Sequence, residues 1–336
     1  MREGSDRLKL IINTPGTYLH RRGECFLMEQ KEEKQEISAI KVEQIFITTH
    51  AALSTDAIEL ALDHNIDIVF LRNTGQPLGR VWHSKLGSIS TIRRKQLFLQ
   101  DKPYGLKLVK EWIEQKMENQ MEHLINLGMN RRDSERRTII KDTTEGIREL
   151  KGKISAIGNK KTVDDVRETI QGYEGTASRI YFGALGKLIP EKYSFSGRSK
   201  NPAKDFFNCF LNYSYGILYS EVEKACIIAG LDPYIGIMHT DNYNKKALVF
   251  DLVEVYRGYM DELVFKLFST KKVYDSHVNV VEEGLYLNQE GKKILISEYN
   301  LLLEKKIRYK GRNIEFANIM QYDCHQIANR ILKEVE

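Results

Sequence analysis

The stretch GIMHTDNYNKKALVFDLVEVYR (residues 236–257) joins two apolar segments through a short polar turn. The second segment is apolar around most of a helical circumference, which predicts a helix inside a helical core. Asp251, Glu254 and Arg257 follow one another at spacings of three, so they lie along one side of this helix. His239 ends the first segment. Because unpaired buried charge is costly, the two carboxylates require partners in the fold.

Two interpretations account for these polar residues. In the first, His239 is a hydrogen-bonded core residue and Glu254 forms a surface salt bridge with Arg257, which are the commoner roles of such residues. In the second, Arg257 neutralises one carboxylate, and a cation bound by His239 and the other carboxylate neutralises the rest. Oxygen-dominated sites suit Mg²⁺ or Mn²⁺; the imidazole favours Mn²⁺ over Ca²⁺ and leaves Zn²⁺ open.

Two further stretches carry polar residues inside apolar segments. In YEGTASRIYFGAL (173–185), Glu174 stands at the head of a segment with helical spacing, where a carboxylate also stabilises a helix N-terminus. In RSKNPAKDFFNCFLNYSYGIL (198–218), a basic loop precedes Asp205 and Asn208, which could serve as a helix cap and a satisfied core residue. One imidazole, one distant Glu and one helical carboxylate would form a metal site able to polarise a phosphodiester.

The composition is that of an ordinary globular protein. Hydrophobic residues make up 42% of the 336 residues and charged residues 29%, which argues against disorder. The charged N-terminus lacks the apolar core of a signal peptide, and no apolar run approaches the length of a membrane span. The four cysteines are scattered without a CxxC pair, which is typical of a reducing compartment. We therefore expect a cytoplasmic protein with no membrane partner.

The hydrophobic pattern predicts an α+β protein of two domains. Residues 1–83 contain short runs of β-branched and aromatic residues, interrupted by one helix that Ser54 or Thr55 could cap. The small polar residues 84–91 predict a linker. Residues 92–336 are expected to be mainly helical. Polar breaks between these helices fall near 128–134, 157–162 and 190–204.

The net charge of +5 is modest but unevenly distributed. Residues 1–90 carry 11 basic and 12 acidic residues, whereas residues 131–161 carry 10 and 5, and residues 179–204 carry 6 and 1. Such segments are often solvated surfaces, and they also suit a polyanion such as double-stranded DNA. The predicted DNA contacts lie at the end of the last segment and are Arg198, Lys200, Asn201 and Lys204.

Four motifs in these stretches resemble those of the CRISPR-associated integrase family, the first-numbered Cas protein. The family pattern E-G-x-A-A-x-x-Y is matched at 174–181, with Ser178 in place of the second Ala. An Arg/Asn/Pro-x-x-Asp-x-x-Asn block is matched at 198–208. The patterns G-L-D-P-x-x-G-x-x-H and L-x-x-D-L-x-E-x-x-R are matched at 230–239 and 248–257. Four motifs in this order are highly specific.

The resemblance implies a metal-dependent DNA endonuclease and integrase. Its metal ligands would be Glu174, His239 and Glu254, holding Mg²⁺ or Mn²⁺; some family members have Asp at the last position. Four more residues would support these ligands or orient a reacting group, namely Asp251, Arg257, Tyr181 and Asn208. A DNA 3′-hydroxyl would attack a phosphodiester of the CRISPR repeat, in two steps on opposite strands. The product is an inserted spacer, which is the step called CRISPR adaptation in antiviral defence.

The resemblance also implies partners. Family members are homodimers through the β-domain and assemble with the small second-numbered Cas protein around a DNA duplex. Two other functions remain open on the residues alone. The acidic cluster could be structural in a non-catalytic nucleic-acid-binding scaffold, or the chain could be a metallohydrolase of small phosphorylated substrates. The basic segments favour DNA over the second of these.

Overall fold

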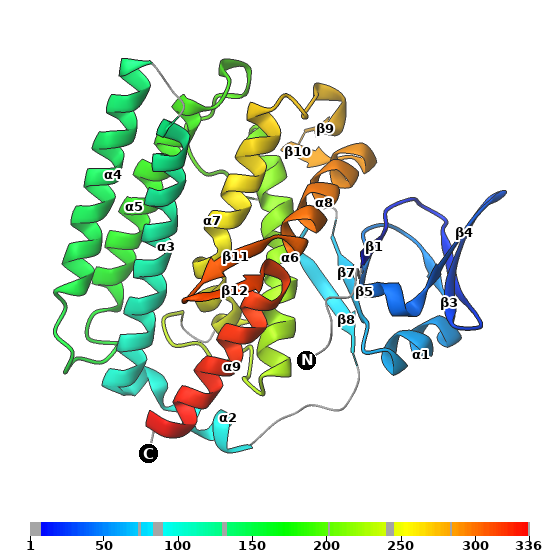
Figure 1. Cartoon of the computed structure of the whole chain (residues 1–336), viewed down its shortest axis with the longest axis horizontal. Coiled ribbons are helices and arrows are strands. Elements are labelled where there is room, and N and C mark those ends of the chain that lie inside the picture. Colours follow the sequence, from blue (N-terminus) through cyan, green and yellow to red (C-terminus); the bar gives the residue numbers. More distant parts are fainter. Residues whose placement is uncertain are drawn as a thin grey trace.

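The computed structural model describes residues 8–72, 75–82, 90–129, 133–200, 202–239, 245–282 and 284–334. A small N-terminal β-domain lies at one end of the molecule, and a larger helical region forms the rest (Figure 1). This architecture confirms the predicted α+β fold. Most of the predicted linker falls on residues 83–89, outside the described residues, so the domain boundaries stay a prediction.

Two four-stranded sheets and one helix build the β-domain. The first sheet has the order β1-β5-β7-β8, in which β1, β5 and β7 are parallel and β8 is antiparallel to β7. The second sheet has the order β4-β3-β2-β6, and helix α1 contacts one strand of each sheet. The elements are β1 Leu8–Ile12, β2 Tyr18–Arg22, β3 Cys25–Gln30, β4 Glu33–Ser38, β5 Val42–Ile47, β6 Ala52–Leu53, α1 Thr55–Asp63, β7 Asp67–Leu71 and β8 Pro77–Val81.

The central strands of the first sheet, β5 and β7, are buried on both faces. Successive side chains of a strand point to opposite faces, so Ile45 and Ile47 of β5 belong to the core of the β-domain. Phe46, between them, belongs to the core of the helical region, as does Val69 of β7. Parallel strands covered on both faces read as nearly continuous apolar runs, which is the pattern of Ile68 to Leu71 in β7. One face of this sheet therefore packs against the helices, and the other face packs inside the β-domain.

Buried ion pairs also join the β-domain to helix α6 (Phe206–Ile228). Lys9 of β1 lies 2.5 Å from Glu221, and both side chains are almost fully buried. Arg80 of β8 pairs with Glu223 at 3.1 Å and donates to the Ser220 carbonyl at 2.9 Å. Separating a buried ion pair leaves uncompensated charges, so these contacts favour one orientation of the β-domain against α6.

Two glycines permit a close backbone approach beside the candidate site. Gly75, between β7 and β8, has a φ of +84°, which favours glycine. A Cβ on Gly216 of α6 would lie only 1.7 Å from the Gly75 carbonyl oxygen. The adjacent Gln76 consequently reaches the cleft described below.

The helical region is organised around α7, which is apolar on most of its circumference. Helix α7 packs between α6 and α3, while α3, α4 and α5 lie side by side at the end away from the β-domain (Figure 1). The elements are α2 Ser90–Leu97, α3 Pro103–Met129, α4 Ser134–Ser155, α5 Arg167–Leu188, α6 Phe206–Ile228, α7 Ala247–Ser269, β9 Val278–Val281, β10 Gly284–Leu287, α8 Gln289–Glu304, β11 Lys306–Tyr309, β12 Arg312–Glu315 and α9 Phe316–Glu334.

Several helix ends follow the local sequence signals. Ser54 caps α1 by accepting the Ala57 N–H at 3.1 Å, which confirms one of the two predicted caps. Asp205 caps α6 by accepting the Asn208 N–H at 2.7 Å. The three predicted breaks coincide with the connections α3–α4, α4–α5 and α5–α6.

The structure corrects one local expectation and adds detail to another. Helix α5 begins at Arg167, so Glu174 lies in the body of the helix and not in a first turn. The hairpins β9–β10 and β11–β12 lie within the region expected to be mainly helical. Within the described ranges, no helix is both long and apolar enough to cross a lipid bilayer.

Candidate active site

The three predicted metal ligands line one cleft of about 580 Å³. Glu174 comes from α5, Glu254 from α7, and His239 from the segment that precedes α7. The residues thus come from three separate segments, and the fold brings them to one cleft. Lys116 of α3 also lines the cleft, although nothing in the motifs points to it.

The two glutamates share one cation. The Lys116 ammonium contacts Glu174 Oε1 and lies 2.5 Å from Glu254 Oε2. Arg257 holds the other oxygen of Glu254, with Nη1 2.5 Å from Oε1. The Ser178 hydroxyl donates to Glu174 Oε1 at 2.9 Å. The small residue that replaces Ala in the family motif therefore supports the carboxylate directly.

The paired cations keep Glu254 ionised. Burial is the largest single influence on Glu254 and would raise its pKa, but the charges of Arg257 and Lys116 outweigh it and lower the pKa to about 2. Burial would lower the pKa of Lys116, yet the charges of Glu254 and Glu174 outweigh it, so that pKa is raised. The cluster therefore holds two anions and two cations at neutral pH.

Asp251 fixes the position of His239. Its buried carboxylate accepts the backbone N–H groups of Ile237 at 2.6 Å, Met238 at 3.0 Å and His239 at 2.9 Å. It also lies 2.7 Å from His239 Nδ1. An ionised carboxylate only accepts, so Nδ1 carries the proton, and Nε2 is the ring atom able to bind a metal.

The exposure of His239 argues against a core role. Its side chain is 43% exposed, whereas that of Asp251 is fully buried. Burial acts most strongly on the His239 pKa and would lower it, but the hydrogen bond and charge of Asp251, with the charge of Glu254, leave the pKa raised. The first interpretation, a buried and satisfied core histidine, does not fit this geometry.

The donors present suit a hard divalent cation. Two carboxylates already share one cation, and an imidazole with its Nδ1 committed faces the same cleft. As the side chains stand, no three His, Cys, Asp or Glu residues among those described are arranged to hold an ion. Lys116 contacts both glutamates instead, so the metal ligand set stays a prediction.

The predicted DNA contact Arg198 is built into the cleft wall. Its guanidinium donates to Asn208 Oδ1 and, at 2.8 Å, to Asn212 Oδ1. It also stacks over the rings of Phe182 and Tyr215, with the guanidinium carbon 5.5 and 5.2 Å from their centroids. Asn208, fully buried, therefore acts on the cleft through Arg198.

The other predicted site residues differ in whether they line the cleft. Lys200 lies at the rim, where partial burial and the charges of Arg257 and Arg198 lower its pKa. Lys204 is exposed and does not line the cleft, and Asn201 lies outside the described residues. Tyr181 is fully buried and is not part of the cleft lining, and its hydroxyl lies 2.7 Å from His123 Nδ1.

The charge of the cleft lining is positive overall. Its basic residues are Lys116, Arg198, Lys200, Lys245 and Arg257. Its acidic residues are Glu174, Glu254 and Asp261. The sequence interpretation missed Lys116, whose only signal is a lysine on the apolar side of a predicted helix, three residues after Ile113 and next to Met117.

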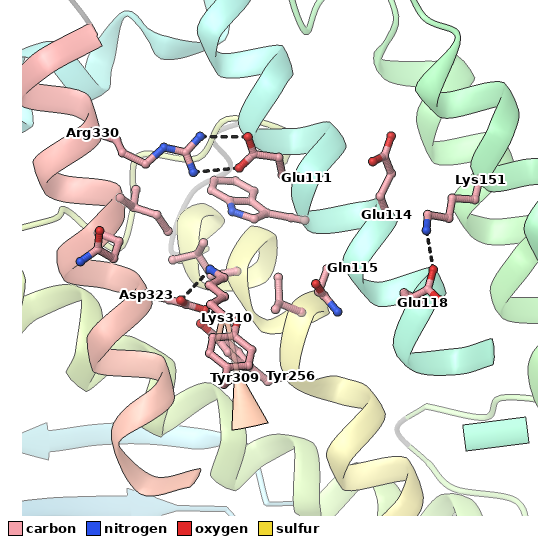
Figure 2. Close-up of a pocket in the computed structure, with 15 residues that line it drawn as sticks. Glu111, Glu114, Gln115, Glu118, Lys151, Tyr256, Tyr309, Lys310, Asp323 and Arg330 are labelled. Carbon is pink, nitrogen blue, oxygen red and sulfur yellow. Dashed lines mark hydrogen bonds and ion pairs between the residues drawn. The ribbon is translucent and has the colours of Figure 1, made fainter. Parts of the chain in front are cut away.

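A second cleft, of about 400 Å³, is lined by other residues of α3 and α7 together with α9 (Figure 2). Three of its carboxylates are neutralised in the pairs Glu111–Arg330, Glu118–Lys151 and Asp323–Lys310. The motif residue Leu252 lines it, but none of the described residues predicted as metal ligands, supporting residues or DNA contacts does. We therefore place the candidate active site in the first cleft.

Comparison with known proteins agrees with the motifs. The model of the family described as CRISPR associated protein Cas1 matches residues 10–301. A CRISPR-associated endonuclease Cas1 of Archaeoglobus fulgidus is 34% identical over 327 residues, which cover 93% of each chain. The chain belongs to the Cas1 family. A Cas1 endonuclease of Saccharolobus solfataricus is 30% identical over 261 residues, covering 76% of this chain and 74% of that one.

Solved structures share the Cas1 fold. A CAS1 protein from Thermotoga maritima superposes with a TM-score of 0.79 at 19% identity and covers 97% of each chain. A casposase bound to an integration product also gives 0.79, at 23% identity, with 98% of this chain and 92% of that one covered. At these identities the likeness concerns the fold alone.

Proposed function

We propose that this chain is a divalent-metal-dependent DNA endonuclease and integrase that inserts spacer DNA into a CRISPR array. The observation that carries the proposal is the single cleft in which Glu174, His239 and Glu254 meet beneath a positively charged rim. Membership of the Cas1 family and the names of its relatives as endonucleases support the same reaction. The likeness to a casposase bound to an integration product is consistent with strand transfer.

The residues of the cleft divide the work. Glu174, Glu254 and Nε2 of His239 would hold Mg²⁺ or Mn²⁺. When bound, such an ion polarises the scissile phosphodiester and lowers the pKa of the attacking 3′-hydroxyl or water. Asp251 keeps His239 in the tautomer that leaves Nε2 unprotonated, and Arg257 keeps Glu254 ionised.

The positive rim would hold the DNA backbone. The exposed residues Lys200 and Lys245 line the cleft. Their charges would attract the phosphates of DNA whatever its base sequence. Arg198 is fixed by side-chain amides and rings, so it would present its charge without further ordering. Double-stranded DNA is therefore the proposed substrate.

We further infer a cytoplasmic homodimer formed through the β-domain, assembling with the small second-numbered Cas protein. The β-domain exposes several large apolar side chains that an interface would bury: Leu8, Tyr18, Ile40 and Leu78. Part of a chain of a Cas6-RT-Cas1–Cas2 complex, 36% of its length, shares this fold with a TM-score of 0.78. Sedimentation equilibrium at micromolar concentration checks the dimer, and a monomer there would contradict it.

The test of the reaction is Glu254→Gln, compared with Glu262→Gln on the same helix. Glu262 is exposed and does not line the cleft, so the same chemical change there is a matched control. We expect Glu254→Gln to lower nicking and strand transfer on a repeat-containing duplex by about 100-fold or more, because one metal ligand is removed. Glu262→Gln should retain both activities in Mg²⁺ or Mn²⁺.

The same assay separates the alternatives. DNA binding without metal-dependent cleavage in the unmodified protein would favour the non-catalytic scaffold. Hydrolysis of small phosphate esters, with weak DNA binding that is independent of salt, would favour the metallohydrolase. Equal activity of the two Gln variants would remove Glu254 from the proposed site.

A further inference from the structure

Lys116 lies where a cation bound by Glu174 and Glu254 would lie. It comes from α3, whereas the two glutamates come from α5 and α7. Its ammonium contacts Glu174 Oε1 and Glu254 Oε2, and its side chain is only 6% exposed. These are carboxylate oxygens that a metal ion would need, so a lysine and a metal cannot both occupy this position.

The charges of the cluster are balanced without a metal. Glu174 and Glu254 supply two negative charges, and Lys116 and Arg257 supply two positive ones. A divalent cation added to this set would make it strongly positive unless one cation moved away or an anion arrived. Arg257 is held by the Tyr219 hydroxyl and by two aromatic rings, which leaves Lys116, on a flexible stem, as the cation able to move.

An anion that could receive the displaced ammonium is the phosphodiester of the substrate. The cleft already gathers Arg198, Lys200 and Lys245 around the same space. A phosphate there would balance the charge of the metal and accept hydrogen bonds from the ammonium. Because the phosphate would draw away the ammonium that blocks the metal, DNA would favour metal binding, and by reciprocity the metal would favour DNA binding to the same degree.

We propose that Lys116 is a positioning residue that competes with the metal for Glu174 and Glu254 until the DNA phosphate draws its ammonium away. The inference rests on the proposed function, because it assumes that these glutamates are metal ligands. It accounts for the ion pairs in the cleft, and it makes DNA a requirement for tight metal binding. Free metal alone would bind weakly, which would protect the cell from cleavage outside the complex with DNA.

The test measures Mn²⁺ affinity by calorimetry, with the protein alone and with a short DNA duplex. Lys116→Met keeps the length of the side chain and removes its charge; Lys107→Met, at an exposed position of α3, is the matched control. Without DNA, we expect Lys116→Met to bind Mn²⁺ about tenfold more tightly or better, because one unit charge a few ångströms away is removed. General damage to the site would weaken binding, so a gain in affinity identifies competition.

Two further measurements complete the test. The melting temperature of metal-free Lys116→Met should fall below that of Lys107→Met, because two carboxylates lose their shared cation, and Mn²⁺ should restore it. Adding the duplex should raise the Mn²⁺ affinity of the unmodified protein several-fold, and should raise that of Lys116→Met by much less.

If Lys116→Met does not fold, Lys116→Arg retains the charge and should bind Mn²⁺ no more tightly than the unmodified protein.

The outcomes distinguish this inference from the function on which it rests. Unchanged Mn²⁺ affinity in Lys116→Met, together with weakened affinity in Glu254→Gln, would overturn the competition and leave the proposed function standing. Tighter Mn²⁺ binding in Lys116→Arg would overturn the competition as well. Equal Mn²⁺ affinity in Glu254→Gln and the unmodified protein would overturn the proposed metal site, and the competition with it.

Discussion

At the scale of single residues, the buried acid Asp251 holds the turn that ends at His239. It accepts three backbone N–H groups and the ring N–H of His239, and its side chain is fully buried. A buried carboxylate is stable only with such partners. Gly236 completes the tight turn, because a Cβ there would lie 2.5 Å from the His239 carbonyl oxygen. The turn and the histidine are thus positioned together.

This arrangement predicts that Asp251 and His239 respond differently to substitution. Asp251→Asn places an amide NH₂ among backbone donors and should cost about 2–4 kcal/mol of unfolding free energy, since buried donors lose their acceptor. His239→Ala removes a partly exposed ring and should cost about 1 kcal/mol or less. Urea denaturation of the metal-free proteins measures both.

Both variants should lose metal-dependent cleavage by orders of magnitude, His239→Ala because a ligand is gone and Asp251→Asn because the ring is no longer oriented. Full activity of His239→Ala in Mn²⁺ would exclude it as a ligand. Loss of the folded state in His239→Ala would instead restore the core-histidine interpretation. A stability cost equal in the two variants would show that Asp251 does not organise the turn.

At the scale of elements, α3 and α5 are joined by a buried polar contact as well as by apolar packing. His123 of α3 is almost fully buried and lies 2.7 Å from the Tyr181 hydroxyl of α5. Burial lowers the pKa of His123 from its usual 6.5 to about 4. The same helix pair carries Lys116 and Glu174, so this contact also maintains the geometry of the cleft.

The His123–Tyr181 contact predicts a loss of stability in acid. Between about pH 6.5 and pH 4 the unfolded chain binds a proton at His123 that the folded protein does not, so unfolding becomes easier as the pH falls. At pH 4 the loss attributable to His123 should be about 3 kcal/mol relative to pH 7. His123→Gln, which can still bond Tyr181 and does not titrate, should lack this component in urea denaturation across the range.

The exposed His325 on α9 provides the control. His325→Gln should retain the acid-dependent loss of the unmodified protein. If His123→Gln and His325→Gln lose stability in parallel between pH 7 and pH 4, His123 is not the group responsible. The comparison does not depend on the other titrating groups, because they are common to both variants.

The elements also show how far the sequence could predict this structure. Helix caps, polar breaks and apolar periodicity are local signals. Short stretches of sequence were therefore enough to predict the helices from α3 to α7 and the cap of α1. The β9–β10 hairpin did not, because its strands are four residues each and lie between long helices. The sequence analysis missed Lys116 for a related reason. Its partners Glu174 and Glu254 lie on other helices, so no local pattern indicates the contact. The residue patterns predicted a metal site of one imidazole, one distant Glu and one helical carboxylate, and the family resemblance then identified these as His239, Glu174 and Glu254.

At the scale of the whole molecule, the charges suggest two paths for DNA. One passes over the cleft, with Lys200 and Lys245 at its mouth. The other follows the exposed face of α4, which carries Lys141 and Arg148. Helix α4 lies beside α3 and α5 at the end of the molecule away from the β-domain (Figure 1), and none of its described residues lines the cleft.

Salt titrations of DNA affinity can separate these paths. Arg198 is bound into the cleft wall, so a clean test replaces only the rim and loop lysines, as Lys200→Ala with Lys204→Ala. If both lysines neutralise phosphates, the slope of log affinity against log salt should flatten by about 1.8, since each phosphate of B-DNA that is no longer neutralised accounts for about 0.9. Two duplexes of unrelated sequence should weaken by similar factors, because phosphate contacts carry no sequence information.

The matched control for this titration is Lys141→Ala with Arg148→Ala on α4, which removes the same number of exposed charges. Its salt slope should stay close to that of the unmodified protein if the duplex runs over the cleft. A flattened slope in the α4 pair, with an unchanged slope in the Lys200 and Lys204 pair, would place the DNA along α4. Mn²⁺ binding without DNA should persist in both pairs, because neither replaces Glu174, Glu254 or His239. A change in DNA affinity therefore reports the path of the duplex and not the state of the metal site.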